Sequence, residues 1–310
     1  MSSFDEIVTV FPDVKDVPDG LPLVVVLSGF SDAGQLAPQL DETISECGRD
    51  TLVAEFARDV LYDYRARRPV AHYDGTRTHQ LDIPELQVSL VETEAGQQFL
   101  YLHGFEPDFR WESVAECLEE LIIELQVSSV TAFHSIPMPV PHTRPIQSAV
   151  SGNRQDIQDE WGMWKPQTQI PASFVHMLEV RLHEASGGEL PFSSFVTLVP
   201  HYLAEAEYPD VLAAALDRLE SATGVTVPAD SLEARRDSFD EKVSAQIREN
   251  SELESLVHGL ELRYDEYMEN FVKAKAHDVD LQNLPTADEI AAEFETFLAS
   301  QAKKDADGDK

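Results

Sequence analysis

The hydrophobic positions along this chain fall into short continuous runs and into longer stretches with helical spacing. Residues 23–27 form a wholly apolar run, which is followed by the turn 28–34 and by apolar residues at helical spacing up to Cys47. A run of this kind is typical of a strand that is buried on both faces of a parallel sheet. Ligands commonly bind at the turn after such a strand, because the following helix offers free N–H groups there.

Strand-like and helix-like segments continue to alternate beyond the first turn. Strands are predicted at 52–57, 127–133 and 194–199, a hairpin at 86–91 and 97–102, and helices at 111–125, 173–185 and 209–222, the last closed by Gly224. The proline-rich segment 135–171 is predicted to be a loop. This alternation predicts a three-layer α/β/α sandwich, and the hairpin makes its sheet mixed rather than purely parallel.

Strand signals stop near residue 230, and a helical appendage is predicted from there on. Ser251 with Glu254 and Thr286 with Glu289 have the spacing of capping boxes. The predicted organisation is a sandwich domain at 1–228, a helical appendage at 229–304 and a disordered tail at 305–310. The appendage has two interpretations: a helical layer packed on its own sandwich, or a surface for an oligomer or a partner.

Composition excludes several classes of function. The net charge of −34 over 310 residues argues against nucleic-acid binding and against docking on anionic membranes. Cys47 and Cys117 lack Cys or His neighbours at ligand spacing, so neither a disulfide framework nor a zinc knuckle is predicted. No complete cofactor motif is present, so no cofactor is predicted. No apolar stretch reaches the length of a membrane span, and the first residues do not resemble a signal peptide. We therefore predict a cytoplasmic protein that binds neither membranes nor nucleic acids.

The turn 28–34 resembles two chemical motifs without completing either. Gly29 and Gly34 are spaced as in a phosphate loop, but no Lys-Ser or Lys-Thr follows, and the carboxylate of Asp32 would repel a phosphate. Ser31 follows Gly29 as in a nucleophile elbow, but Ala33 stands where the second glycine belongs. The simpler interpretation is that Ser31 or Asp32 caps the next helix while the glycines allow the turn.

Three histidines stand at or just after the ends of predicted strands. If those strands are parallel, His103, His134 and His201 share a sheet edge with Asp32 and Glu106. Such a cluster could serve acid–base chemistry or bind a metal, although a histidine in this position commonly satisfies loop carbonyls instead. The predicted sheet-edge cleft comprises Ser28, Gly29, Ser31, Asp32, Gly34, His103, Glu106, His134 and His201.

Basic side chains are concentrated in one short stretch of this acidic chain. Arg65 and Arg68 lie in that stretch, and His142 and Arg144 lie in the proline-rich segment. These four residues are predicted contacts for an anion or a partner, because guanidinium groups bind carboxylates and phosphates in bidentate fashion. The alternative is pairing with the abundant acids, either within the chain or between subunits.

Taken in order, five segments resemble the proteasome assembly chaperone 2 family of bacteria and archaea. They are residues 28–34, 63–69, 103–107 followed by Trp111, 139–145 and 200–202, and the helical tail is similar to that of actinobacterial members. The resemblance implies a phosphorylase/hydrolase-like sandwich and a homo-oligomer. The homo-oligomer that the family resemblance suggests is a trimer. Its namesakes help to assemble proteasome rings. The sequence ends in 306–310 without the hydrophobic-tyrosine tail of proteasome-docking chaperones, so docking through such a tail is not expected.

The leading hypothesis is a non-catalytic, self-associating protein-binding or assembly factor with an unknown protein partner. No complete catalytic or cofactor motif is present to indicate more. The alternative is a hydrolase- or phosphorylase-like enzyme for small molecules. Its acid–histidine site would lie at the sheet edge, and Arg65, Arg68 or Arg144 would bind an anionic substrate. That alternative requires Asp32, Glu106 and at least two of the histidines to converge.

Overall fold

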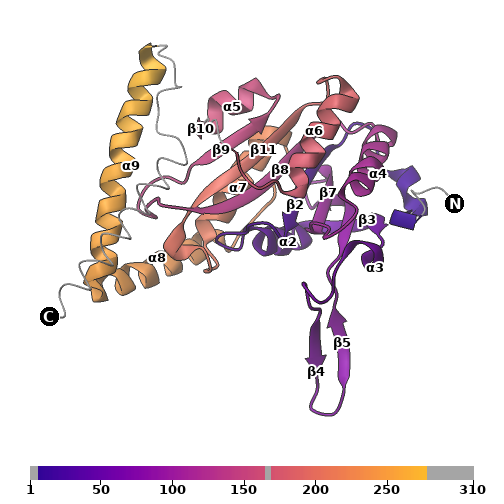
Figure 1. The fold of residues 1–310 in the computed structure, drawn as a ribbon, viewed down its shortest axis with the longest axis horizontal. Helices are drawn as coiled ribbons and strands as arrows, with labels where there is room; N and C mark the ends of the chain where they lie inside the picture. Colours follow the sequence, from indigo (N-terminus) through magenta and orange to yellow (C-terminus); the bar gives the residue numbers. More distant parts are fainter. Residues whose placement is uncertain (1–5, 165–168, 278–310) are drawn as a thin grey trace.

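The computed structural model describes residues 6–164 and 169–277, which form a large mixed sheet covered by helices on both faces (Figure 1). Within these residues the sheet has nine strands in the order β1-β3-β6-β7-β2-β8-β11-β9-β10. The strands are β1 Val8–Val10, β2 Pro22–Ser28, β3 Gly48–Phe56, β6 Leu86–Thr93, β7 Gln98–Phe105, β8 Ser129–Met138, β9 Ser148–Gly152, β10 Gly162–Trp164 and β11 Phe192–Pro200.

Four adjacent strands at the centre of the sheet are parallel. β2 pairs with β7 on one side and with β8 on the other, and β8 pairs with β11. β6 and β7 form the predicted hairpin, which makes the sheet mixed. The carboxyl ends of β7, β2, β8 and β11 therefore meet at one edge of the sheet, which is the condition that the predicted sheet-edge cleft required.

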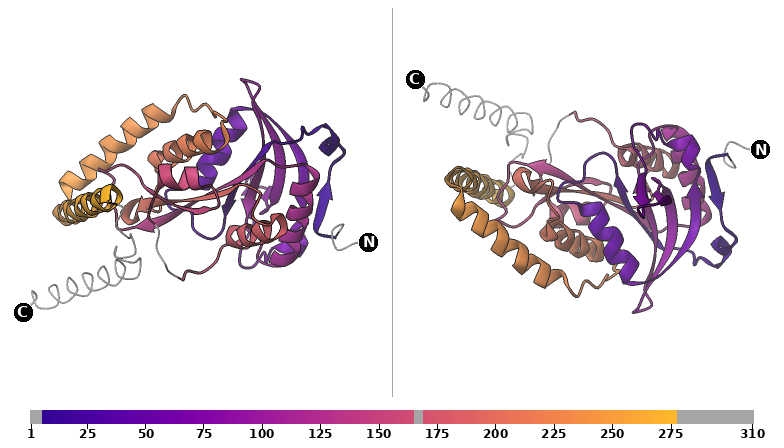
Figure 2. Two further views of the ribbon diagram at one scale, coloured as in Figure 1. Left: turned by 90° about the horizontal axis from the view of Figure 1, so that it is seen from above. Right: turned by 90° about the horizontal axis from the view of Figure 1, so that it is seen from below.

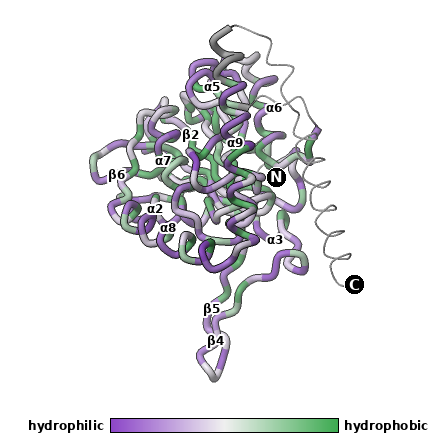
Figure 3. Tube along the Cα trace, turned by 90° about the vertical axis from the view of Figure 1, so that its left-hand side faces the viewer, coloured by the Kyte–Doolittle hydropathy of each residue, from purple (hydrophilic) through white to green (hydrophobic). Residues whose placement is uncertain are grey.

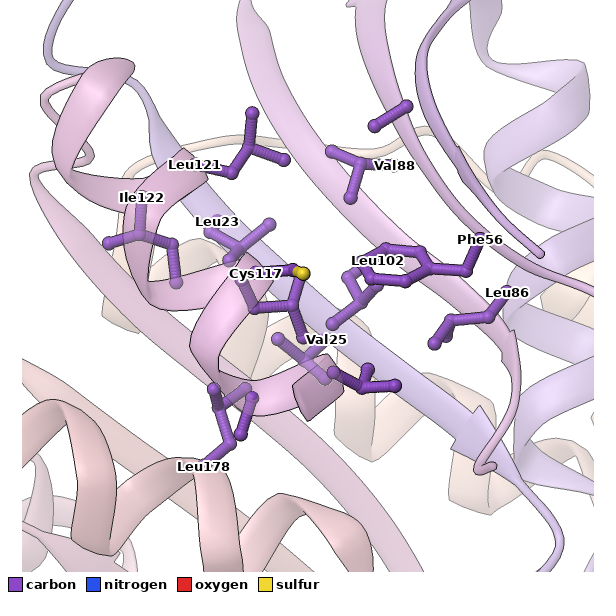
Figure 4. Packing of buried hydrophobic residues seen from close by; sticks show 14 of the residues in the cluster. Leu23, Val25, Phe56, Leu86, Val88, Leu102, Cys117, Leu121, Ile122 and Leu178 are labelled. Carbon is purple, nitrogen blue, oxygen red and sulfur yellow. The ribbon is translucent and has the colours of Figure 1, made fainter. Parts of the chain in front are cut away.

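Two hydrophobic clusters lie on opposite faces of the sheet, which gives three layers (Figure 2). The main helices are α2 Leu36–Glu46, α4 Trp111–Glu124, α5 Gln155–Trp161, α6 Phe174–Ser186 and α7 Pro209–Thr223. Leu23 and Val25 of β2 pack on the face of α4 and α6, where Figure 4 shows them beside Cys117 and Leu121. Val24 and Val26 pack on the opposite face against α2 and α7. A strand buried on both faces explains why this run is continuously apolar.

The prediction of a loop at 135–171 is wrong for most of that segment. β8 continues to Met138, and β9, α5 and β10 follow. β9 reads Ser-Ala-Val-Ser-Gly and so has little of the hydrophobic pattern of a strand. Its antiparallel pairing with β11, with Ser148 opposite Thr197, makes it a strand. Ile157 anchors α5 because its side chain is buried in the core.

A small separate hairpin was not predicted. β4 Val70–Tyr73 and β5 Thr78–Asp82 pair with each other, and we call residues 70–82 the arm. The arm stands clear of the rest of the molecule in Figure 1. Its sequence is mostly polar, so the period-two pattern that identifies strands is weak there. It follows α3 Arg58–Leu61 and the basic stretch of the chain.

The appendage consists of α8 Leu232–Glu249 and α9 Ser251–His277. Phe239 of α8 lies 5.3 Å from Tyr208, and Val243 belongs to the same hydrophobic cluster as α7. Asn250 caps α9 by accepting hydrogen bonds from the first turn, one residue before the predicted Ser251. The predicted cap at Thr286 and the predicted tail 305–310 lie outside the described residues. The domain boundaries remain predictions.

Among the described residues, none of the helices combines the length and the hydrophobicity that a transmembrane segment needs.

Candidate functional site

The edge formed by the carboxyl ends of the parallel strands contains a topological switch point. β2 leads into α2 on one face of the sheet, whereas its neighbour β7 leads into α4 on the other face. Where neighbouring strands leave in opposite directions, a crevice forms outside their carboxyl ends, and ligands of open α/β sheets bind in such crevices. Gly29 follows β2 and Glu106 follows β7 at this point.

Gly29 is packed against two charged side chains. Its φ of +121° is unfavourable for any L residue. A methyl group at this position would lie 3.0 Å from both Nη atoms of Arg67 and 3.0 Å from Cγ of Glu106. The Arg67 guanidinium lies 4.6 Å from the centroid of the Phe105 ring and donates to Oδ1 of Asp108 at 3.3 Å. The glycine therefore allows Arg67 and Glu106 to meet over the turn.

Glu106 connects the strand end to α6. Its backbone N–H donates to the carbonyl of Ser28 at 2.8 Å, and its Oε2 accepts from the N–H of Phe174 at 2.9 Å. A carboxylate in this place favourably meets the positive end of the α6 dipole. Burial raises the pKa of Glu106, while the Phe174 N–H and the charge of Arg67 oppose that rise.

His134 of β8 and His176 of α6 complete this group. Their rings lie nearly parallel, with centroids 6.2 Å apart. Nδ1 of His176 accepts from the Ser173 N–H at 3.0 Å, so the network assigns the proton of a neutral His176 to Nε2. His176 also interacts electrostatically with Glu106. We call Arg67, Glu106, His134 and His176 the crevice group.

His134 is the least satisfied member of the crevice group. Its side chain is buried, at 6% relative exposure, and neither ring nitrogen has a hydrogen-bond partner among the described residues. Burial lowers the pKa of His134 to about 4, and His176 adds to that effect. The imidazole is therefore neutral at physiological pH, with one donor and one acceptor.

Asp32 and His103 lie on the opposite face of the sheet. Oδ1 of Asp32 accepts from Ala37 N–H at 2.9 Å, which caps α2 as the simpler interpretation expected. His103 pairs in register with Val26 and stacks on Tyr101 with centroids 4.7 Å apart. Tyr101 donates a short hydrogen bond to Asp41 of α2. These groups form a second polar cluster under α2.

The remaining turn residues also lie toward α2 and α7. Ser31 Oγ donates to the carbonyl of Ser135 at 2.9 Å. Gly34 has a φ of +74°, and a methyl group there would lie 3.1 Å from Val211 and 3.2 Å from Tyr208. Ser31 and Gly34 therefore fix the turn against its neighbours.

His201, His142 and Arg144 belong to a third group near the appendage. His201 starts the short 3₁₀ helix η2 His201–Leu203, and its ring lies 5.5 Å from that of Tyr202. Nδ1 of His142 lies 2.7 Å from the Tyr202 hydroxyl. Arg144 forms a bidentate pair with Asp265 of α9, with both distances 2.7 Å. Arg144 is thus engaged in the internal pairing that was the alternative to anion binding.

The comparisons with known proteins agree with this architecture. The family model for the PAC2 family matches residues 26–247. The chain belongs to the PAC2 family. A Mycobacterium tuberculosis protein of unknown function shares 27% identity and a TM-score of 0.80, with 87% of this chain and 92% of that chain covered. No curated protein matches the chain.

Two further structures extend the likeness of this PAC2 chain. A Corynebacterium glutamicum protein of unknown function has 27% identity and a TM-score of 0.79, covering 86% of this chain and 99% of that chain. A proteasome-assembly chaperone homologue from Mycobacterium tuberculosis has 24% identity and a TM-score of 0.69, covering 76% of this chain and 100% of that chain. At 24% identity the likeness shows the shared fold.

The predicted site residues of this PAC2 protein therefore divide into three groups. Ser28, Gly29, Glu106 and His134 lie at the crevice; Ser31, Asp32, Gly34 and His103 lie toward α2 and α7; His142, Arg144 and His201 lie near the appendage. Alternate side chains of a strand point to opposite faces, so a shared edge does not bring His103 and His134 together. No group of His, Cys, Asp and Glu in the described residues could hold a metal ion.

The sequence reasoning missed Arg67 and His176. Arg65 and Arg68 were predicted from the basic stretch, but Arg67 between them is the arginine over Gly29. The backbone N–H of Arg65 donates to Asp63 Oδ1 at 2.9 Å within its own turn. His176 lies inside a predicted helix, where a single histidine gives no sign of a site. Its position three residues after Ser173 has the spacing of a capping box, and this spacing could have placed it at the start of the helix.

Replacing Arg144 with glutamine is expected to loosen α9 without unfolding the PAC2 domain. The substitution removes the bidentate pair with Asp265, whereas exposed ion pairs contribute little to global stability. Hydrogen exchange should become faster around residues 261–265 while Tm stays nearly constant. Arg77→Gln, which removes the same charge from the arm, is the control. Equal hydrogen-exchange rates at residues 261–265 in both variants would contradict the conclusion that the ion pair of Arg144 with Asp265 holds α9 in place.

Proposed function

We propose that this PAC2 protein is a cytoplasmic, self-associating assembly factor without catalysis of its own, and that the arm makes the contact between copies. Family membership and the fold shared with a proteasome-assembly chaperone homologue support an assembly role. The observation that carries the proposal is the arm. It is a two-stranded hairpin that leaves the molecular body, as Figures 1 and 3 show.

The exposed face of the arm supports protein binding. An isolated two-stranded hairpin is only marginally stable in water, so it gains from a surface to pack on. Ala71 pairs with Leu81, so these two share one face of the arm; Tyr73 follows a register irregularity and pairs with Thr78. The side chains of Tyr73 and Leu81 are 65% and 52% exposed. Burial of such apolar side chains against a neighbour would stabilise both the arm and the assembly.

Charge supports a second copy of this chain as the neighbour. Arg65 and Arg68 stand directly before the arm, and Arg77 is at its tip. The whole chain carries a net charge of −34, so a second copy offers an acidic surface for this basic element. The family resemblance favours a trimer, and the assembled copies would then present their surfaces to a further protein partner.

The geometry supports assembly better than the enzymatic alternative. That alternative requires the acids and histidines to share one cleft. Asp32 instead bonds to α2 and Glu106 bonds to α6, and these helices cover opposite faces of the sheet. His103 and His134 are divided in the same way.

The test measures solution mass by light scattering after size-exclusion chromatography. Wild-type protein at micromolar concentration is expected to be an oligomer, and the double variant Tyr73→Ser/Leu81→Ser is expected to be a monomer with unchanged Tm. Leu262→Ser removes a leucine that is 60% exposed on α9 and serves as the control, which should remain oligomeric. A monomeric wild type, or an arm variant that keeps its mass, would overturn the proposal.

A further inference from the structure

The crevice group contains buried polar atoms that the rest of the chain does not satisfy. Both ring nitrogens of His134 and Nε of Arg67 are buried without a hydrogen-bond partner in the described residues. Buried polar groups in folded proteins are nearly always hydrogen-bonded, because leaving one unpaired costs free energy. Two such residues lie in one group at the switch point of the sheet. Their unpaired polar atoms indicate that a ligand supplies the missing hydrogen bonds.

The two residues lie on the same side of the sheet. His134 follows Phe133, which pairs with Val26 and faces α2, so the side chain of His134 faces α6. Its stacking with His176 agrees with this direction. Glu106 interacts electrostatically with both Arg67 and His176, and its carboxylate accepts from the first N–H of α6. Glu106 therefore links Arg67 to the histidine pair.

The charges of the site disfavour an anionic ligand. Arg67 is matched by two carboxylates, Glu106 and Asp108, and the chain as a whole is strongly acidic. The start of α6, which would otherwise attract an anion, already holds the Glu106 carboxylate. An additional negative charge would therefore be repelled, and a cation buried among these covered groups would lose its hydration, so an uncharged ligand is favoured.

The shape of the surrounding groups favours a flat ligand. Trp111 and Phe174 pack edge to face with centroids 5.9 Å apart, and Phe105 lies under Arg67. A neutral His134 offers one donor and one acceptor from a single ring. An amide or a heteroaromatic ring carries acceptors and donors that can pair with a nitrogen of this ring, and it has an apolar body for the aromatic side chains.

We propose that the crevice group binds an uncharged planar amide or heteroaromatic compound, with the ring of His134 as a hydrogen-bonding partner. Both nitrogens of His134 are covered in this conformation, so entry requires movement of the first turn of α6. Ligand binding at this place does not depend on the assembly role of the arm, and either proposal can fail without the other.

The test uses the full chain labelled with ¹⁵N-histidine and three neutral probes: nicotinamide, cytosine and uracil at millimolar concentration. At least one probe is expected to shift the ring signals of His134 and to raise Tm, because a ligand that binds the folded state stabilises it. His134→Phe should weaken that binding at least tenfold. His103→Phe, which changes the histidine on the opposite face, should leave it unchanged.

A second measurement separates a ligand site from a structural histidine. Without probe, His134→Phe is expected to raise Tm, because it removes two unsatisfied buried nitrogens and keeps a ring of similar size. A lower Tm for this variant would overturn the proposal, since it would show that the imidazole stabilises the fold. The proposal is also overturned if none of the three probes moves the His134 signals, or if acetate or phosphate moves them instead.

Discussion

Replacing Gly29 with alanine is expected to lower the free energy of unfolding by about 2–4 kcal/mol. Two causes combine. The backbone has a φ of +121°, which strains any residue with a side chain, and the new methyl group would lie 3.0 Å from Arg67 and from Glu106. Arg67 can yield at its flexible end, but Glu106 is held by its bond to Phe174. Urea unfolding followed by circular dichroism measures the change.

Gly187→Ala is the matched control for this prediction. Gly187 closes α6 with a φ of +63°, and a methyl group there would meet nothing within 4 Å. Its loss should be about 1 kcal/mol, because only the left-handed backbone is penalised. An equal loss in both variants would mean that the approach of Arg67 and Glu106 to the turn contributes nothing to stability.

Replacing Asp41 with asparagine is expected to stabilise the protein by up to about 3 kcal/mol at pH 8 and not at pH 4. Burial raises the pKa of Asp41 from 3.8 to about 6, and the charges of Asp32 and Glu85 add to the rise against the hydrogen bond from Tyr101. The folded state therefore holds this proton more tightly than the unfolded state. The favourable contribution of Asp41 is present below pH 4 and is lost as the pH rises through 6.

The measurement is the difference in unfolding free energy between Asp41→Asn and wild type at several pH values. The comparison with wild type is needed because His134 also makes stability depend on pH, with the opposite sign. Its lowered pKa means that the folded state loses stability as the pH falls below 6.5, in wild type and variant alike. Glu42→Gln on the exposed side of the same helix is the control, with no comparable change expected. A difference that does not depend on pH between 4 and 8 would contradict the burial of a charged Asp41.

The sequence pattern was reliable where one element buries a continuous or regularly spaced apolar surface. The run at 23–27 became β2, and the spacing from Trp111 to Leu125 became α4, because both bury those positions against the core. The pattern failed at β9 and at the arm, whose strands are polar and are defined by their pairing partners. Pairing between distant segments leaves little local signal.

The sequence alone determined that this chain forms an acidic α/β protein with polar residues at the ends of its strands; that the central strands are parallel came from the structure. It also placed Gly29, Glu106 and His134 at or just after strand ends, because strand ends follow from the hydrophobic pattern and the turn residues. Only the tertiary structure decided which of them face the same way. The alternation of strand side chains sent His103 toward α2 and His134 toward α6. The conformation of the basic stretch places Arg67, and not Arg65 or Arg68, against Gly29. No local sequence pattern distinguishes these three arginines.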